Sequence, residues 1–313
     1  MCGYDEISTQ ILKISSPYIS SPLNYIHNKV LVTGFFQSRL KYSEIKPLYK
    51  KGDKNNIVNW RPISLLPSFS KVFEKVTNMR LLEHINNNKI LVKEQFGSRS
   101  KWTAETASYS LFSEILNTLN NKNIIGGIFC DLTKAFNCLN NGILPSNWRY
   151  YDITGTIYSL IKSYLEDRHQ KVKLVHNDYK SCSSLGTVKH GVLQGSVLGP
   201  LLFLLYINDI TKITDTKDNN NKFKLVLFVD DTSPITTRPN PTNFIKNING
   251  AFTNMNNWFK TNLLSLNFVK TSLIQFLIKS SSHFPTSVGC DNNINSNIIN
   301  TKFLRIMNDK ILM

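Results

Sequence analysis

The segment KLVLFVDDTSPI, residues 224–235, places two adjacent aspartates directly after five apolar residues. Together with Phe223, this run predicts a buried strand over residues 223–229 that ends at Asp230 and Asp231. Like charges at the end of a buried strand are unfavourable unless they are paired or bind a cation. We therefore expect these two carboxylates to have a partner or to bind a cation.

A second apolar segment has the same design. NIIGGIFCD, residues 123–131, predicts another buried strand, and it ends on Asp131. If the two strands are neighbours in one sheet, three carboxylates meet at one point, where Mg²⁺ would find the oxygen ligands it prefers. Two such ions about 4 Å apart can promote an in-line phosphoryl displacement. An Asp-Asp pair before Thr, Ser and Pro is by itself more often a solvated turn, so both interpretations stay open.

The composition favours a globular protein with a polyanionic partner. The chain has 313 residues, 41% of them hydrophobic, and 37 Lys and Arg against 21 Asp and Glu give a net charge of +16. Five cysteines without a C-x-x-C pair indicate neither a disulfide framework nor a zinc site, so we expect an intracellular protein of the cytoplasm or nucleus. The longest strongly apolar run, residues 201–207, is far shorter than the roughly 20 residues that span a bilayer, so no membrane partner is expected.

Apolar periodicity predicts helices interleaved with strands. Ser70 is expected to cap a helix whose core face carries Val72, Val76, Met79 and Leu82. Further helices are predicted from Thr103 to Leu119, from Ile153 to Tyr164, from Leu201 to Ile210 and from Ile245 to Phe259, with a strand at QKVKLVH, residues 170–176. This order favours an α+β architecture with helices packed on one face of a sheet.

Several motifs, taken in order, resemble the reverse transcriptase domain of non-LTR retrotransposons, the LINE-like and jockey-type elements. They are GYDEIS at residue 3, IKPLYKKGDKNNIVNWRPISLLPSFSKVFEK, EQFGSRS, DLTKAF, VKHGVLQGSVLGPLLFLLYINDI, LFVDDTS, LSLNFVKT and TKFLRI. The resemblance implies the polymerase right-hand fold, with fingers and palm around an antiparallel sheet. It further implies a single domain over residues 1–313, mostly fingers in 1–125 and mostly palm in 126–313, and without a thumb, an endonuclease or a zinc knuckle.

The resemblance also implies the catalytic residues. The aspartates of DLTKAF and FVDD are the metal-binding catalytic residues of the family, and they fall on Asp131, Asp230 and Asp231. Two Mg²⁺ ions are the implied cofactors, with Mn²⁺ as a possible substitute. Lys270 matches a lysine that protonates the leaving pyrophosphate, although it is equally compatible with an exposed surface lysine.

Residues for the incoming nucleotide are implied in the same way. Basic residues before and within WRPISLL match the fingers motif that grips the triphosphate, with Arg61 first and Lys50 and Lys51 after it. Phe136 matches an aromatic steric gate that excludes a ribose 2′-OH, and Gln194 and Gly195 match the motif that positions template and nucleotide. The plainer alternatives are a solvated charge run, a core phenylalanine and a simple turn.

The expected function is RNA-directed DNA synthesis, in which dNTPs extend a DNA primer 3′-OH on an RNA template. The alternative is a truncated, decayed element fragment that is inactive and at most binds nucleic acid through its basic surface. Substitutions relative to the family pattern favour this alternative. Pro234, just after the aspartates, is expected to fit only a strand edge or a bulge. The substituted positions are Asn137, Asn141, Leu193, Val229 and Arg305.

Overall fold

The computed structural model describes residues 3–99, 102–176, 179–214 and 223–276, together with the backbone of four short strands between residues 287 and 309. Arg305 lies outside the described residues. The chain forms two compact units, each built from two separate segments: Met1–Ile90 with Phe136–Tyr206, and Leu91–Ala135 with Ile207–Met313. The expected mixture of helices and strands is confirmed, whereas the division into fingers and palm stays a prediction.

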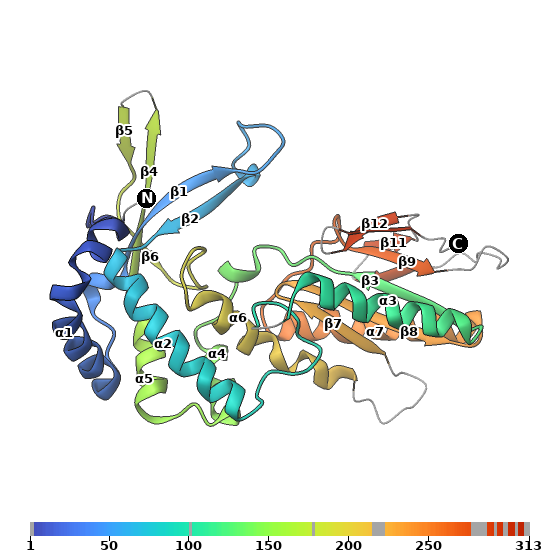
Figure 1. Cartoon of the computed structure of the whole chain (residues 1–313). Coiled ribbons are helices and arrows are strands. Elements are labelled where there is room, and N and C mark those ends of the chain that lie inside the picture. The colour runs from blue at the N-terminus through green and yellow to red at the C-terminus, as the bar shows by residue number, and fades with distance from the viewer. Residues whose placement is uncertain are drawn as a thin grey trace. The chain divides into compact units, whose positions relative to one another are not determined.

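The second unit is built on a four-stranded antiparallel sheet in the order β7-β8-β3-β9 (Figure 1). Both predicted strands are confirmed, as β3 and β7, but they are separated by β8 instead of lying side by side. The strands are β3 (Ile124–Phe129), β7 (Lys224–Phe228), β8 (Asp231–Arg238) and β9 (Ser272–Phe276), and the backbone pairs β10 (Ser287–Cys290) with β11 (Asn293–Ser296) and β12 (Asn300–Phe303) with β13 (Ile306–Asp309).

Helices cover both faces of this sheet, so the expected packing on one face is wrong. The helix predicted from Thr103 is confirmed as α3 (Ala104–Asn120), which Thr103 caps in a capping box, and its apolar residues share a core with Ile125 and Phe129 of β3. α7 (Pro241–Thr261) packs on the other face, where a Cβ on Gly126 would lie 2.6 Å from the Phe244 ring. Alternating side chains of β3 point to opposite faces, and both faces are apolar, so each needs its own helix.

Pro234 lies inside β8, a strand paired on both sides, so the expectation of an edge or bulge position is wrong. It is in register with Leu225 of β7. On the other side, the pairs with β3 run from Ile124 to Gly127 and resume only at a bridge between Cys130 and Thr232. Because proline has no N–H to donate, the sheet accommodates it by interrupting the ladder with β3 at that point.

The first unit combines helices with a mixed sheet in the order β2-β1-β4-β5, in which β6 also pairs with β4. β1 and β4 are parallel, and the other pairs are antiparallel. The strands are β1 (Tyr42–Tyr49), β2 (Trp60–Leu65), β4 (Arg168–His176), β5 (Tyr179–Cys182) and β6 (Gly186–Val188), and the helices are α1 (Thr9–Thr33), α2 (Ser68–Asn87), α4 (Ile143–Trp148), α5 (Gly155–Leu165) and α6 (Gly199–Ile207).

The helix expected after Ser70 is confirmed as α2, but its cap and its core face are not those expected. The helix already begins at Ser68, and the Ser70 hydroxyl donates to the Leu40 carbonyl. Val72 and Met79 are exposed, whereas the buried residues are Ser68, Ser70, Phe73, Glu74, Thr77, Leu81 and Ile85. The helix turns a polar residue, Glu74, inward because that carboxylate has partners in the interior.

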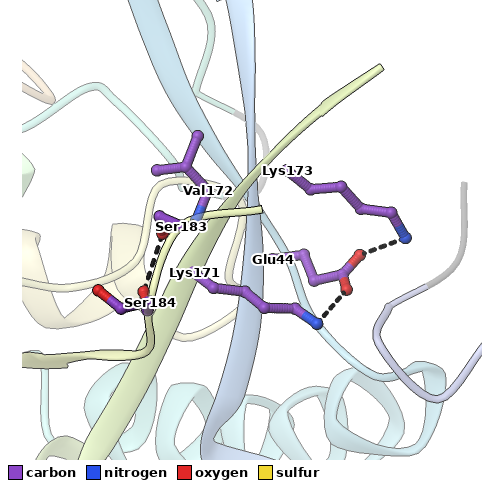
Figure 2. Close-up of polar contacts among 6 residues, drawn as sticks. All are labelled: Glu44, Lys171, Val172, Lys173, Ser183 and Ser184. Carbon is purple, nitrogen blue, oxygen red and sulfur yellow. Dashed lines mark hydrogen bonds and ion pairs between the residues drawn. The ribbon is translucent and has the colours of Figure 1, made fainter. Parts of the chain in front are cut away.

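A buried carboxylate also joins β1 to β4 (Figure 2). Glu44 accepts ion pairs from Lys171 at 3.1 Å and from Lys173 at 3.2 Å. Burial alone would raise the pKa of Glu44, but the two lysines lower it below its ordinary value. On the other edge of β4, the Val172 N–H donates to the Ser183 hydroxyl at 3.0 Å, and that hydroxyl donates to the Ser184 carbonyl. Polar side chains thus join β4 to β1 on one edge and to the segment after β5 on the other.

The apolar run at residues 201–207 forms most of α6 and is buried throughout. The helix ends at Ile207, earlier than expected, and a 3-10 helix continues from Asn208 to Thr214. In the described part of the chain, no helix is both long enough and apolar enough to cross a membrane.

Replacing Gly126 should destabilise the second unit. In Gly126→Ala, the new Cβ would lie 2.6 Å from Phe244 Cζ and 2.8 Å from the Ile274 carbonyl, so the strand or α7 must shift. We expect a loss of about 1–3 kcal/mol in the free energy of unfolding, measured by urea denaturation. Gly186→Ala is the control, because its Cβ would meet no heavy atom closer than 3.8 Å. Equal effects of the two substitutions would contradict the close packing.

Candidate active site

Strand pairing brings the three predicted aspartates to one end of the antiparallel sheet. Asp131 follows β3, Asp230 lies in the turn after β7, and Asp231 is the first residue of β8. Cys130 and Thr232 exchange backbone hydrogen bonds of 3.0 and 3.3 Å, which aligns Asp131 with Asp231 across the two paired segments. All three aspartates are partly exposed.

The pKa of Asp231 reflects the charges of the other two aspartates. Burial, together with the negative charges of Asp230 and Asp131, raises the pKa of Asp231 to about 6. Lys270 opposes the increase. An excess of negative charge at a partly exposed sheet end is the condition that a bound cation relieves.

Lys270 is held against Asp131 by the segment between α7 and β9. The Asn267 N–H donates to the Asp131 carbonyl at 2.9 Å, and the Lys270 N–H donates back to the Asn267 carbonyl at 3.0 Å. The Lys270 ammonium then reaches the Asp131 carboxylate, with 2.7 Å between Nζ and Oδ2. The LSLNFVKT segment thus places its lysine among the carboxylates.

The donor set suits a hard divalent cation. Carboxylate oxygens that remain open to water match the preference of Mg²⁺ or Mn²⁺. Among the residues that the structure describes, no three His, Cys, Asp or Glu side chains converge as a complete ligand group. Since Lys270 occupies Asp131 Oδ2, a cation would have to share or displace this contact, and solvent or substrate would complete its coordination.

The first unit gathers the residues predicted for the nucleotide around β2. The Ser64 N–H of β2 donates to the Gln194 carbonyl at 2.8 Å. Gly195 has a φ of +112°, and a Cβ there would lie 2.9 Å from the Ser64 carbonyl, so only glycine fits this approach. The Gln194–Gly195 turn is therefore held against the strand that carries Arg61.

Arg61, Lys50 and Lys51 are exposed on the β1–β2 hairpin. Arg61 is in register with Leu48, and the Lys50 N–H donates to the Asn59 carbonyl across the hairpin. Their side chains are therefore accessible to an anion. Phe136 is half-buried, its ring lies 5.1 Å from that of Phe203, and its carbonyl accepts from the Val192 N–H two residues before Gln194.

A family model described as "Reverse transcriptase (RNA-dependent DNA polymerase)" matches residues 49–290, which is most of the chain. The chain belongs to the reverse transcriptase family. The resemblance drawn from the sequence motifs is thereby confirmed, and the relatives below agree with a domain of the non-LTR retrotransposon type.

Curated relatives of this reverse transcriptase domain come from mobile elements of Drosophila melanogaster. It is 28% identical to "Probable RNA-directed DNA polymerase from transposon BS", over 99% of this chain and 34% of the relative. It is 30% identical to "RNA-directed DNA polymerase from mobile element jockey", over 75% of this chain and 25% of the relative. The chain thus spans about a third or less of the length of these relatives.

A solved structure supports the fold alone. "Structure of apo telomerase from Candida Tropicalis truncated from C-terminal domain" aligns with a TM-score of 0.54 at 16% identity, over 87% of this chain and 57% of that one. This likeness agrees with the reverse transcriptase fold, and it carries no statement about substrates.

Glu74 is a buried residue near these motifs that sequence reasoning missed. Its carboxylate accepts from the Val197 N–H at 2.6 Å and from the Tyr164 hydroxyl at 3.1 Å. Burial raises the pKa of Glu74, while Arg168 and these hydrogen bonds oppose the increase. Glu74 thus anchors the turn that follows Gln194 and Gly195. A second set of residues at helical spacing in the same segment, Phe73, Thr77 and Leu81, could have indicated the face of the helix that is buried.

Neutralising Asp231 should stabilise the cation-free reverse transcriptase domain at high pH. Because its folded pKa of about 6 lies above the ordinary value, the folded state holds the proton more tightly, and this group lowers stability as pH rises from about 4 to about 6. In Asp231→Asn this loss disappears, so we expect a gain of about 1–2 kcal/mol in unfolding free energy at pH 8 with EDTA, and a smaller gain at pH 4.

Thermal denaturation of both proteins at the two pH values measures this difference. Asp53→Asn in the exposed β1–β2 loop is the control, because it removes the same charge outside the carboxylate group. If Asp231→Asn gains no more at pH 8 than at pH 4, the repulsion assigned to this site is wrong.

Proposed function

We propose that this chain is the RNA-directed DNA polymerase domain of a non-LTR retrotransposon. It extends a DNA primer 3′-OH with dNTPs on an RNA template. The observation that carries the proposal is the strand pairing that places Asp131, Asp230 and Asp231 at one end of the sheet, where the neighbouring carboxylates help to raise the pKa of Asp231. Membership of the reverse transcriptase family supports the same reaction.

The three aspartates would hold the divalent cations. When bound, two Mg²⁺ ions supply activation of the attacking hydroxyl and stabilisation of the leaving oxygen. Asp230 and Asp231 contribute hard oxygen ligands from the β7–β8 hairpin and Asp131 from the end of β3, and Asp231 must be deprotonated to serve as one of them. Lys270 lies within 2.7 Å of Asp131 and can donate a proton to the pyrophosphate that leaves.

Residues of the first unit would bind the nucleotide. Arg61 offers a bidentate contact to phosphate oxygens, and Lys50 and Lys51 add positive charge from the same hairpin. Gly195 lets the turn that it forms with Gln194 pack closely against β2, and this turn would position template and nucleotide. Phe136 would exclude a ribose 2′-OH through its half-buried ring.

Primer extension on an RNA template with Mg²⁺ and dNTPs tests the proposal. We expect extension by the wild-type chain and a loss of at least about 100-fold in Asp230→Asn, because that substitution removes a charged ligand without changing shape. Asp53→Asn is the matched control and should extend normally. If the wild-type chain does not extend a primer yet binds the same RNA, the chain is a nucleic-acid-binding fragment, and the polymerase proposal fails.

Phe136→Ala should relax sugar selection. Removal of the ring opens space for a 2′-OH, so the ratio of kcat/KM for rNTP to that for dNTP should rise about tenfold or more. Phe136→Tyr keeps the ring and should keep the wild-type ratio. An unchanged ratio in Phe136→Ala would assign this side chain to the core contact with Phe203 alone.

A further inference from the structure

The turn that carries Asp230 has a conformation that its own residues do not favour. Val229 and Asp230 form a two-residue connection between Phe228 and Asp231, which are paired across the hairpin. Val229 has a φ of +56°. A positive φ at the first position of such a turn is usually taken by glycine, and it is strained for a β-branched residue. Something outside the hairpin must therefore hold Val229 in place.

The EQFG segment, residues 94–97, runs along the free edge of β7. The Leu227 N–H donates to the Glu94 carbonyl at 2.9 Å, and the Phe96 N–H donates to the Leu227 carbonyl at 2.8 Å. Gln95 and Leu227 form a parallel bridge. The segment thus extends the four-stranded sheet by one short pairing at the strand that leads into the turn.

The Gln95 side chain reaches from this pairing to the turn itself. It is 1% exposed, and its Oε1 accepts from the Val229 N–H at 3.1 Å and from the Gly97 N–H at 2.8 Å. One amide oxygen therefore satisfies the half-buried N–H of the strained residue and fixes the segment that covers it.

Gly97 lies directly against the same residue. A Cβ at position 97 would lie 2.4 Å from the Val229 nitrogen and 2.5 Å from its Cγ2, so no other residue leaves the turn where it is. Arg99 keeps the segment in place, because its guanidinium donates to the carbonyls of Gln95 at 3.1 Å and Val92 at 2.7 Å. Gln95 and Gly97 thus contact the turn from a segment that is itself anchored.

We propose that Gln95 and Gly97 are positioning residues that hold the Val229–Asp230 turn, and with it the Asp230 carboxylate, in the geometry needed for polymerisation. This inference rests on the proposed function, to which it adds two residues that touch neither substrate nor cation. Their contribution is to keep a strained backbone in one conformation, so that the carboxylate does not have to be reordered in each catalytic cycle.

The Gln95→Met variant tests the proposal, since methionine fills the same space without the acceptor oxygen. Hydrogen exchange at the Val229 amide should become about tenfold faster, the factor expected for one lost hydrogen bond. In primer extension, kcat should fall about 100-fold while KM for dNTP changes less than about threefold. Gly97→Ala is a second variant and should give the same pattern through displacement of the turn.

Gln275→Met is the matched control. Gln275 is fully buried in β9, which does not pair with β7, and its side-chain amide has no hydrogen-bond partner among the residues that the structure describes, so the same substitution there changes a buried glutamine to methionine without removing a hydrogen bond. Thermal melting of each variant checks that the protein is folded. We expect Gln275→Met to leave both the Val229 exchange and the kcat unchanged.

Each result separates this inference from the proposed function. Unchanged exchange at Val229 in Gln95→Met overturns the hydrogen-bonded clamp, whatever the activity. Faster exchange with a kcat equal to that of Gln275→Met overturns the positioning role and leaves only a structural contact. If the wild-type chain is inactive, the polymerase proposal fails, and the exchange measurement alone decides whether Gln95 holds the turn.

Discussion

The geometry of the aspartate site depends on the pairing of β8 with two strands at once. A two-residue turn joins β8 to β7, so Asp230 and Asp231 lie at the tip of a hairpin. The bridge between Cys130 and Thr232 sets the register with β3 and brings Asp131 to the same end. A shift of one residue in either pairing would turn a carboxylate to the opposite face of the sheet. The apolar strands and the helices on both faces make such a shift unfavourable.

Buried polar side chains hold the turns that strand pairing leaves open. Gln95 accepts from the backbone of Val229, and Glu74 accepts from the backbone of Val197 after the Gln194–Gly195 turn. The two contacts lie in different units of the chain, yet each gives a half-buried backbone N–H its acceptor. A fully buried donor without a partner would cost about 1–3 kcal/mol and a half-buried one less, so these acceptors favour one conformation of each turn.

Elements with a strong periodicity could be predicted from the sequence, whereas their orientation was harder to predict. The strands before Asp131 and Asp230, and the helix after Thr103, follow from apolar runs and a cap, and they are confirmed. The predicted core face of α2 was wrong because the Glu74 carboxylate has hydrogen-bond partners that are distant in the sequence. Pro234 was assigned to an edge or bulge, but β8 is paired on both sides and tolerates it through a break in the ladder. Each error arose where a non-local contact outweighed a local preference.

The sequence by itself determined the family of this protein and the three aspartates, because ordered motifs and charged residues at the ends of apolar strands are local features of the chain. The tertiary structure decided that β8 separates the two strands, that Lys270 contacts Asp131, and that Gln95 and Gly97 cover Val229. These contacts join residues more than 100 positions apart, and their geometry comes from strand register and side-chain packing. Neither is encoded in any single segment, because register is set jointly by the strands that pair.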